Sequence, residues 1–126
     1  MMKVHESGEM YLESILVLRK KIANVRSIDI VNHTGYTKPS ISRAINLLKQ
    51  DNMVIVDDNG YITLTPEGEA LAIKIYERHN ILTQLFEKLG VSPETADSDA
   101  CKIEHVISDE TFERIKEHLL EYTGEK

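Results

Sequence analysis

The sequence has a single cysteine and no long hydrophobic run. Because Cys101 has no second cysteine to pair with, the chain cannot form an internal disulfide bond, which fits a reducing compartment and leaves one thiol for packing, catalysis or metal binding. No apolar stretch is long enough for a signal peptide or a membrane helix, and charged residues occur throughout the N-terminal segment. We therefore expect a cytoplasmic protein that does not insert into a membrane.

The common short motifs of enzymes are also missing. The chain contains no nucleophile elbow, no phosphate-binding loop and no helical zinc-hydrolase motif. A metalloenzyme is therefore the weaker hypothesis, and we expect no small-molecule substrate. Internal repeats and long linkers are absent as well, and 126 residues can bury one core, or two small cores that share an interface.

Basic residues are not in excess, but the charge is unevenly distributed. The formal net charge of −6 argues at first against nucleic-acid binding, because phosphate neutralisation needs clustered lysine and arginine. Residues 1–68 contain eight basic and eight acidic side chains, whereas the remainder contains seven basic and thirteen acidic ones. The whole excess of negative charge lies in the second half, which suggests that the two halves have different functions.

The first half of the chain predicts three helices. Apolar residues recur at helical spacing from Glu9 to Lys21, and Ser27 is placed to cap a short second helix that ends at Gly35. In the third helix Thr37 is the expected N-cap, and the first turn tolerates the proline that follows. The apolar face of this helix consists of Ile41, Ala44, Ile45 and Leu48.

Two short runs of β-branched and aromatic residues follow the third helix. They are "MVIV" at residues 53–56 and "YITL" at residues 61–64. Between them, Asn59 and Gly60 suit the positive φ of a hairpin turn. Three helices followed by a two-stranded wing form a winged helix-turn-helix.

The second half predicts helices only. Thr65 and Pro66 open a long helix that ends at Gly90, and Ser92 and Ser108 are placed to cap two further helices. The long helix carries an apolar stripe of Leu71, Ile75, Leu82, Leu85, Phe86 and Leu89. The sequence thus predicts a mainly α protein, with a winged helix-turn-helix domain at residues 1–70 and an all-helical domain at residues 71–126.

The polar face of the third helix is the candidate DNA-binding surface. Its side chains can hydrogen-bond phosphates or base edges, and a helix N-terminus favours anions. We expect DNA contacts from Thr37, Lys38, Pro39, Ser40, Ser42, Arg43, Asn46 and Lys49. The alternatives are a solvated helix face and a protein-binding winged helix, and the latter predicts no salt-sensitive DNA binding.

The segment "CKIEH" at residues 101–105 is the candidate metal site. On a helix, Cys101, Glu104 and His105 share one face, and thiolate, carboxylate and imidazole groups are all metal ligands. Three ligands within five residues rarely complete a site, so further ligands must come from elsewhere. The alternative is structural, with a buried thiol beside a glutamate and a histidine at the surface.

Four segments extend over nearly the whole chain: "GEMYLESILVL", "TKPSISRAINLL", "LTPEGEALAIKIYERHNIL" and "DACKIEHVISDE". In order and spacing they resemble the diphtheria toxin repressor family of metal-dependent regulators. The resemblance implies a winged helix that binds DNA, a helical second domain that forms a homodimer, and metal held between the two that switches DNA affinity. It also implies the two-domain form, without the small third domain of many iron-responsive members.

The resemblance implies a principal metal site formed by Met10, Cys101, Glu104 and His105. All four positions match the iron-responsive branch, whereas the manganese-responsive branch has an aspartate and a glutamate at the first two. Thioether and thiolate ligands also favour softer or later ions over Mn²⁺. We therefore expect Fe²⁺ as the cofactor, with Mn²⁺ as the alternative and Co²⁺, Ni²⁺ and Zn²⁺ as possible surrogates.

The resemblance also implies a possible second site at His79, Glu13 and Asp97. His79 matches a family ligand and Glu13 matches a ligand of the manganese branch, but Thr83 stands where a glutamate is expected. Asp97 stands near the position of a histidine in the iron branch. The remaining histidines are expected at the surface: His5, His33 and His118.

The function implied is that of a homodimeric repressor that binds a palindromic double-stranded DNA operator when loaded with metal and controls metal homeostasis genes. An ion bound by both domains acts as a crosslink that holds two recognition helices at successive major grooves. The alternative from another class is a winged-helix regulator that senses an organic ligand and keeps its cysteine in the core.

Overall fold

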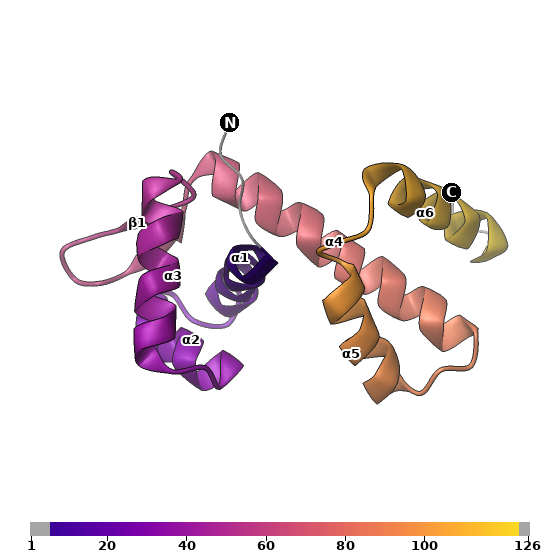
Figure 1. The fold of residues 1–126 in the computed structure, drawn as a ribbon, viewed down its shortest axis with the longest axis horizontal. Coiled ribbons are helices and arrows are strands. Elements are labelled where there is room, and N and C mark those ends of the chain that lie inside the picture. The colour runs from indigo at the N-terminus through magenta and orange to yellow at the C-terminus, as the bar shows by residue number, and fades with distance from the viewer. Residues whose placement is uncertain (1–5, 124–126) are drawn as a thin grey trace. The chain divides into compact units, whose positions relative to one another are not determined.

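The structure is a computed structural model that describes residues 6–123, with side chains described for residues 8–120. It is mainly helical, as predicted, with one two-stranded sheet (Figure 1). The elements are α1 (Glu6–Arg19), α2 (Ser27–Thr34), α3 (Lys38–Gln50), β1 (Val54–Val56), β2 (Ile62–Leu64), α4 (Pro66–Lys88), α5 (Pro93–Ile103) and α6 (Asp109–Thr123). The chain forms two compact units, residues 1–74 and residues 75–126, and α4 is continuous from the first into the second.

The first unit encloses one apolar core between α1, α2, α3 and the sheet. Its buried apolar side chains are Tyr11, Leu12, Ile15, Leu16, Leu18, Val25, Ile30, Ile41, Ile45, Leu48, Val54 and Ile62, together with Ala72 from the start of α4. α1 begins earlier than the predicted Glu9 and ends at Arg19, before the predicted Lys21. Burial raises the pKa of Tyr11, and the nearby Tyr36 raises it further.

The start of α2 differs from the prediction. The N-cap is Arg26, not Ser27, and the side chain of Asp29 accepts the Arg26 N–H at 2.9 Å. A carboxylate three residues after the N-cap therefore accepts the hydrogen bond of the N-cap amide. The prediction considered only a serine side chain as the cap and did not include this contact. The end of α2 is as predicted, because Gly35 adopts the left-handed conformation with φ 80°.

The wing is the predicted antiparallel hairpin, but its turn differs in detail. Gly60 has a positive φ of 83°, whereas Asn59 does not, so the prediction for Asn59 is wrong. The carboxylate of Asp57 accepts the N–H groups of Asn59 and Tyr61, both at 2.9 Å. This side chain fixes the turn from within, so only one residue needs the left-handed conformation.

The N-terminus of α4 packs closely against the chain before the wing. Thr65 caps it as predicted, because its hydroxyl accepts the Gly68 N–H at 3.0 Å and donates to the Asn52 carbonyl at 2.7 Å. A Cβ atom added at Gly68 would lie 2.0 Å from the Met53 carbonyl oxygen. Only glycine permits this approach of two backbone segments.

An ion pair also ties α4 to α1 within the first unit. The Arg19 guanidinium donates to both carboxylate oxygens of Glu69, and the shorter contact is 2.8 Å. These hydrogen bonds and the positive charge of Arg19 lower the pKa of Glu69. Both side chains are well exposed, so the pair contributes little to stability.

The regular elements of the second unit, among its described residues, are all helices. Its buried apolar side chains are Ile75, Leu82, Ala96, Ala100, Phe112 and Leu119. Ser92 and Ser108 cap α5 and α6 as predicted, by accepting the backbone N–H groups of Thr95 and Thr111. Leu89 does not belong to the buried stripe, because α4 ends at Lys88 and Leu89 is 71% exposed. No described helix combines the length and apolar composition needed to cross a membrane.

Candidate metal centre and nucleic-acid interface

Four potential metal ligands of the second unit form a continuous series of contacts. Oε1 of Glu104 lies 2.7 Å from Nδ1 of His79, and Oε2 of Glu104 lies 3.5 Å from Nε2 of His105. The other ring nitrogen of His79 lies 2.8 Å from Oδ1 of Asp97. Glu104 and His105, which were predicted for the principal site, are thus contiguous with His79 and Asp97, which were predicted for the second.

These four side chains come from α4, α5 and the turn after α5. His79 lies midway along α4, and Asp97 lies on α5. Glu104 is the C-cap of α5, retains helical backbone angles, and donates its N–H to the Ala100 carbonyl at 2.9 Å. The end of α5 therefore delivers the Glu104 carboxylate to the side of α4 that carries His79.

The Glu104 carboxylate carries the clearest signal of an unfilled interaction. The side chain is 0% exposed, and its Oε2 atom makes no hydrogen bond to any described group. A buried charged acceptor without a donor costs free energy, and native proteins rarely contain one without a functional reason. A carboxylate whose two oxygens each face an imidazole ring fits a divalent transition-metal ion, whose preferred ligands include both groups.

The segment containing Cys101 differs from the predicted helix face. α5 ends at Ile103, so His105 lies in the following turn and not on the same regular helix as Cys101. The thiol of Cys101 is exposed, whereas the side chain of Glu104 is 0% exposed and that of His105 is 7% exposed. The alternative of a buried thiol beside two surface charges is therefore wrong, because Cys101 is exposed and the side chains of Glu104 and His105 are buried.

Two further predicted ligands belong to α1. Met10 and Glu13 are half-buried residues of α1 in the first unit, and their spacing of three places them on neighbouring positions of one helix face. Thr83, which replaces an expected glutamate, donates its hydroxyl to the His79 carbonyl at 2.7 Å. Its oxygen is thus engaged with the helix backbone, as hydroxyls within helices often are.

Arg78 borders the cluster and was missed from the sequence alone. It is 5% exposed, and its guanidinium donates to the backbone carbonyls of Glu104 and Ile107. A signal was available, because Arg78 lies three positions after Ile75 and four before Leu82, both on the buried side of α4. A charged residue on an apolar stripe needs internal partners, and here the partners hold the turn that carries Glu104 and His105.

The third helix presents the predicted polar face. Its apolar face is buried through Ile41, Ile45 and Leu48, so the opposite side is open to solvent. Seven of the eight predicted DNA contacts are exposed, and Ser40 is half-buried. Thr37 accepts the Ser40 N–H at 3.3 Å, which fixes the helix N-terminus next to Lys38.

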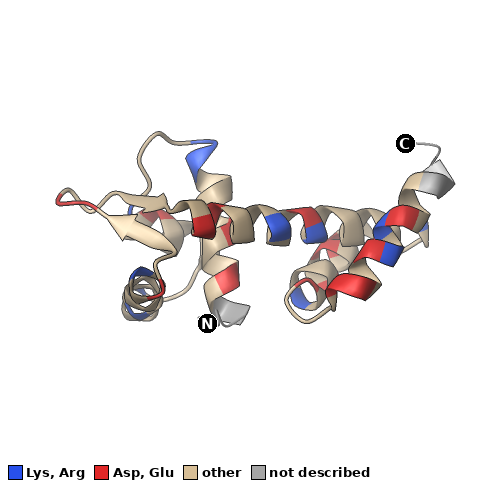
Figure 2. Cartoon of the chain, turned by 90° about the horizontal axis from the view of Figure 1, so that it is seen from above, with Lys and Arg blue, Asp and Glu red and all other residues tan. Residues whose placement is uncertain are grey.

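The wing does not extend this basic face. Its tip carries Asp57 and Asp58, both exposed, and appears as a red loop at the left of Figure 2. Arg26, which precedes α2, contacts the residue that follows the wing turn, with its guanidinium carbon 4.7 Å from the centre of the Tyr61 ring. The first unit therefore offers positive charge from helices and negative charge from the wing tip.

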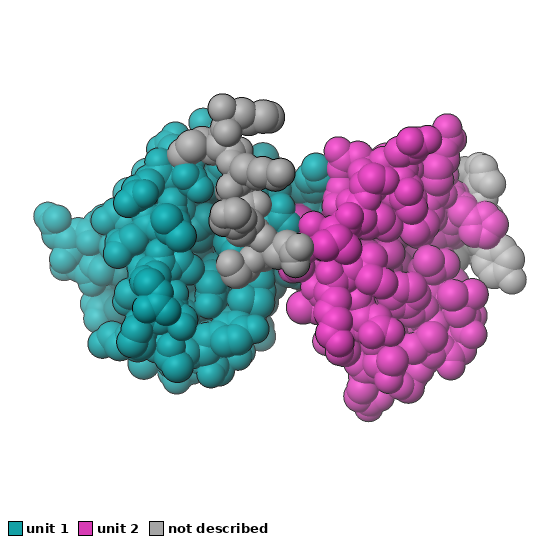
Figure 3. Space-filling model, in the orientation of Figure 1, with its two compact units in different colours: residues 1–74 teal, residues 75–126 magenta. Residues whose placement is uncertain are grey.

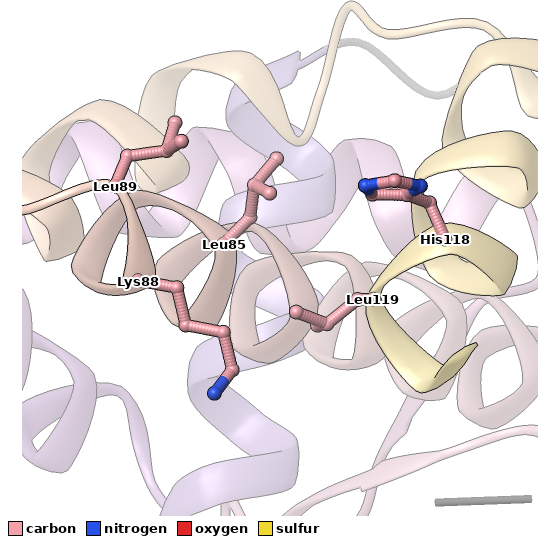
Figure 4. A pocket seen from close by; sticks show the side chains of 5 residues that line it. All are labelled: Leu85, Lys88, Leu89, His118 and Leu119. Atoms are coloured by element: carbon pink, nitrogen blue, oxygen red, sulfur yellow. The ribbon is translucent and has the colours of Figure 1, made fainter. Parts of the chain in front are cut away.

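The second unit, magenta in Figure 3, contains an apolar groove (Figure 4). The groove has a volume of about 270 Å³ and is lined by Leu85, Lys88, Leu89, His118 and Leu119. A hollow of about 410 Å³ shares Leu85 and His118 and adds Ile115 from α6. His118 and His33 are exposed, as predicted for surface residues, and His5 lies outside the described residues.

Comparison with known proteins finds relatives over most of the chain. Residues 65–123 match the family described as iron dependent repressor, metal binding and dimerisation domain. The transcriptional regulator MntR of Escherichia coli O6:H1 is 32% identical over 106 residues, which cover 84% of this chain and 68% of that protein. The diphtheria toxin repressor of Corynebacterium efficiens is 29% identical over 119 residues, which cover 94% of this chain and 52% of that protein.

A solved structure is also similar to most of this chain. A manganese-dependent transcriptional repressor in complex with manganese is similar with a TM-score of 0.79 at 26% identity, over 89% of this chain and 52% of that chain. The chain therefore spans about two thirds of the Escherichia coli regulator and about half of the other two proteins. Proteins named as an iron-dependent repressor and as a manganese-dependent repressor are both among those similar to this chain.

Proposed function

Because the chain belongs to the diphtheria toxin repressor family of metal-dependent transcriptional repressors, we propose that it binds a palindromic DNA operator as a homodimer when it holds a divalent metal ion. The observation that carries this proposal is the buried Glu104 carboxylate, which contacts His79 and approaches His105 but has one oxygen without a hydrogen-bond donor among the described residues. A buried carboxylate with an unbonded oxygen can bind a cation, and a role in packing alone explains it poorly.

The chain's own residues supply ligands from both units. We assign Met10, Cys101, Glu104 and His105 to a principal ion, and His79, Glu13 and Asp97 to a possible second ion. When bound, the metal supplies positive charge that neutralises clustered carboxylates and a link between residues of the two units. Met10 and Glu13 lie on the first helix of the DNA-binding unit, so they transmit occupancy of the site to that unit.

The ligand chemistry favours Fe²⁺ as the physiological ion. The thioether of Met10 and the thiolate of Cys101 are softer ligands than the oxygens Mn²⁺ prefers. Glu13, Asp97 and the similarity to a manganese-dependent repressor support Mn²⁺ as the alternative. Co²⁺, Ni²⁺ and Zn²⁺ are expected to act as surrogates, because imidazole and carboxylate ligands suit them as well.

The exposed face of α3 is proposed to enter the major groove. Arg43 and Asn46 have the donors needed to reach base edges, whereas Lys38 and Lys49 are placed for phosphate contacts. A homodimer places two such helices about 34 Å apart, which matches the spacing of successive major grooves and requires a palindromic operator. We expect the regulated genes to serve metal homeostasis.

The apolar groove of the second unit supports the homodimer. Leucine side chains and Ile115 leave apolar surface beside α4 and α6, and burying it against a second copy is favourable. The matching family description names dimerisation for this part of the chain. We propose that the two copies meet through this surface.

The test is DNA binding with and without metal under reducing, oxygen-free conditions, because the exposed Cys101 thiol is open to oxidation. The probe is a DNA fragment selected from a random-sequence pool by the protein in buffered Fe²⁺. A chelator should abolish binding, and added Fe²⁺ should restore it. Binding unchanged by the chelator would support an organic-ligand sensor, and the absence of any salt-sensitive DNA binding would support a protein-binding winged helix.

A further inference from the structure

We propose that Arg78 is a positioning residue of the metal centre, which sets the place of Glu104 and His105 by holding the backbone turn between α5 and α6. This inference rests on the proposed function, because it assumes that Glu104 and His105 bind metal. Arg78 itself has no lone pair to offer an ion, since its guanidinium stays protonated. Its contribution is therefore to the geometry of the ligands.

Three acceptors around the turn converge on the Arg78 guanidinium. Nη1 donates to the Ile107 carbonyl at 2.7 Å and to the Glu104 carbonyl at 3.2 Å, and Nη2 donates to the Asp109 carboxylate. A guanidinium is planar and rigid, so three acceptors bound to it are held in fixed relative positions. One side chain of α4 thereby fixes the end of α5, the turn and the start of α6.

The placement of this positive charge is favourable for the end of α5. The last carbonyl groups of a helix lack intrahelical partners, and the C-terminal end of a helix attracts cations. The Glu104 carbonyl belongs to the C-cap of α5, and the Ile107 carbonyl lies in the turn that follows. Arg78 provides the donors that these groups would otherwise take from water.

α4 holds Glu104 from two directions with consecutive residues. Arg78 binds the Glu104 backbone carbonyl, and His79 contacts the Glu104 carboxylate at 2.7 Å. The backbone and the side chain of Glu104 are therefore both held by the same turn of α4. His105, the next residue, is fixed by the same backbone contact.

Burial makes a purely stabilising role a poor explanation for Arg78. The residue is 5% exposed, its Nε atom has no hydrogen-bond partner among described groups, and its guanidinium carbon lies 5.5 Å from the centre of the Phe112 ring. A buried ion pair is often no more stabilising than an apolar side chain of similar volume. The gain from Arg78 lies in the fixed positions of the atoms that it binds.

The chain offers a matched control for the contact between α4 and α6. Lys116 on α6 donates to Glu77 on α4 at 2.6 Å, and this hydrogen bond raises the pKa of Lys116. Replacing Lys116 by methionine removes a cation between the same two helices without changing a group that binds the turn. A general weakening of helix packing should affect both variants, whereas loss of ligand positioning should affect only Arg78→Met.

The experiment is a Co²⁺ titration of the full chain, with affinity and the visible absorption spectrum of bound Co²⁺ as readouts, and with circular dichroism and dimer mass measured for each variant. We expect Arg78→Met to bind Co²⁺ about 10- to 100-fold more weakly, as loss of a group that orients metal ligands typically does. Its Co²⁺ spectrum should change, Arg78→Lys should recover part of both properties, and Lys116→Met should match the unmodified chain.

The inference is overturned if folded Arg78→Met keeps the affinity and spectrum of the unmodified chain, or if Lys116→Met reduces affinity equally. If Arg78→Met does not fold, Asp109→Asn replaces it, because it weakens one acceptor of the same guanidinium and leaves α4 intact. An unchanged spectrum in Asp109→Asn then counts against the inference. If the unmodified chain binds no Co²⁺, the proposed function fails, and this outcome is distinct from failure of the Arg78 assignment.

Discussion

Glu104 combines complete burial with an incomplete set of hydrogen bonds. Its Oε1 atom contacts His79, whereas Oε2 lies 3.5 Å from Nε2 of His105 and makes no hydrogen bond to any described group. An apolar residue or a glutamine at this position would avoid the cost of a buried, partly unpaired charge. The carboxylate is therefore best explained by a task in which the charge is used, and metal binding is that task in our account.

The first prediction follows from this cost. Glu104→Gln keeps the shape of the side chain and removes its charge, so Co²⁺ affinity should fall by about 100-fold or more if the carboxylate is a ligand. The free energy of unfolding of the metal-free protein should stay the same or rise by up to about 1 kcal/mol, because the variant has no buried charge at this position. Isothermal titration and thermal melts measure the two quantities. Unchanged Co²⁺ affinity would remove Glu104 from the site.

The second prediction concerns Met10. Replacing this residue of α1 by aspartate exchanges a soft thioether for a hard oxygen ligand, so the response of DNA binding should shift towards Mn²⁺. The measurement compares DNA affinity over buffered free concentrations of Fe²⁺ and Mn²⁺. The neighbouring Glu9→Gln variant serves as a control for changes on the same helix. If Met10→Asp leaves the order of the two metals unchanged, Met10 is a packing residue.

Residue types in a motif could be recognised from the sequence, but their surroundings could not. The spacing of Cys101, Glu104 and His105 indicated a metal site, yet nothing local distinguishes an exposed thiol from a buried carboxylate. That difference arises because α5 ends at Ile103 and its C-cap packs beside α4. Arg78 was overlooked for the same reason, since its acceptors lie 26 to 31 positions further along the chain.

At the scale of elements, local signals located most of the helices. Thr37, Thr65, Ser92 and Ser108 cap the helices for which they were predicted, because capping depends on contacts within four residues. Ser27 was predicted to cap α2, but the N-cap is Arg26. The Asp29 carboxylate bonds the backbone N–H of Arg26 and so starts the helix one residue earlier than the serine signal indicated. Gly68 gave no signal, since its close contact is with Met53, which lies 15 positions earlier in the connection between α3 and β1.

The third prediction tests that contact. Gly68→Ala should lower the free energy of unfolding by about 1 to 3 kcal/mol, because the added methyl group overlaps the Met53 carbonyl and the backbone must shift. Chemical denaturation measures the effect. Glu67→Ala, an exposed change at the adjacent position, is the control and should cost about 0.5 kcal/mol or less. Equal effects of the two variants would show that α4 is not tightly packed at Gly68.

The fourth prediction concerns the wing. Asp58 places a negative charge at the exposed tip, where a DNA-bound winged helix lies near phosphates, so it should weaken binding. Asp58→Asn should therefore increase affinity for DNA several-fold at low salt, and less at high salt because charges are screened. Glu113→Gln, which removes one exposed charge from α6, is the control for net charge. Identical changes in both variants would mean that the wing tip lies away from DNA.

At the scale of the whole molecule, the charge distribution agrees with a division of tasks. Residues 1–68 have balanced charge and contain the exposed polar face of α3, whereas the later residues contain the acidic excess together with Asp97, Glu104 and His105. The fold class and family could be predicted because four motifs occur in the right order along the chain. The physiological metal could not, because its ligand set combines features of two branches.

The central claim is that metal binding and DNA binding are thermodynamically coupled through residues of both units. A preference for the DNA-competent state worth about 3 kcal/mol corresponds to more than a hundredfold change in affinity. Coupling of this kind is reciprocal, so bound DNA must strengthen metal binding by the same factor by which metal strengthens DNA binding.

The most direct test is to measure Fe²⁺ affinity without oxygen, first for the free protein and then with saturating selected DNA. Our account predicts that DNA increases Fe²⁺ affinity about a hundredfold or more, which equals the increase in DNA affinity caused by Fe²⁺. The same Fe²⁺ affinity with and without DNA would contradict the account, because Fe²⁺ binding that does not depend on DNA cannot change the affinity for DNA.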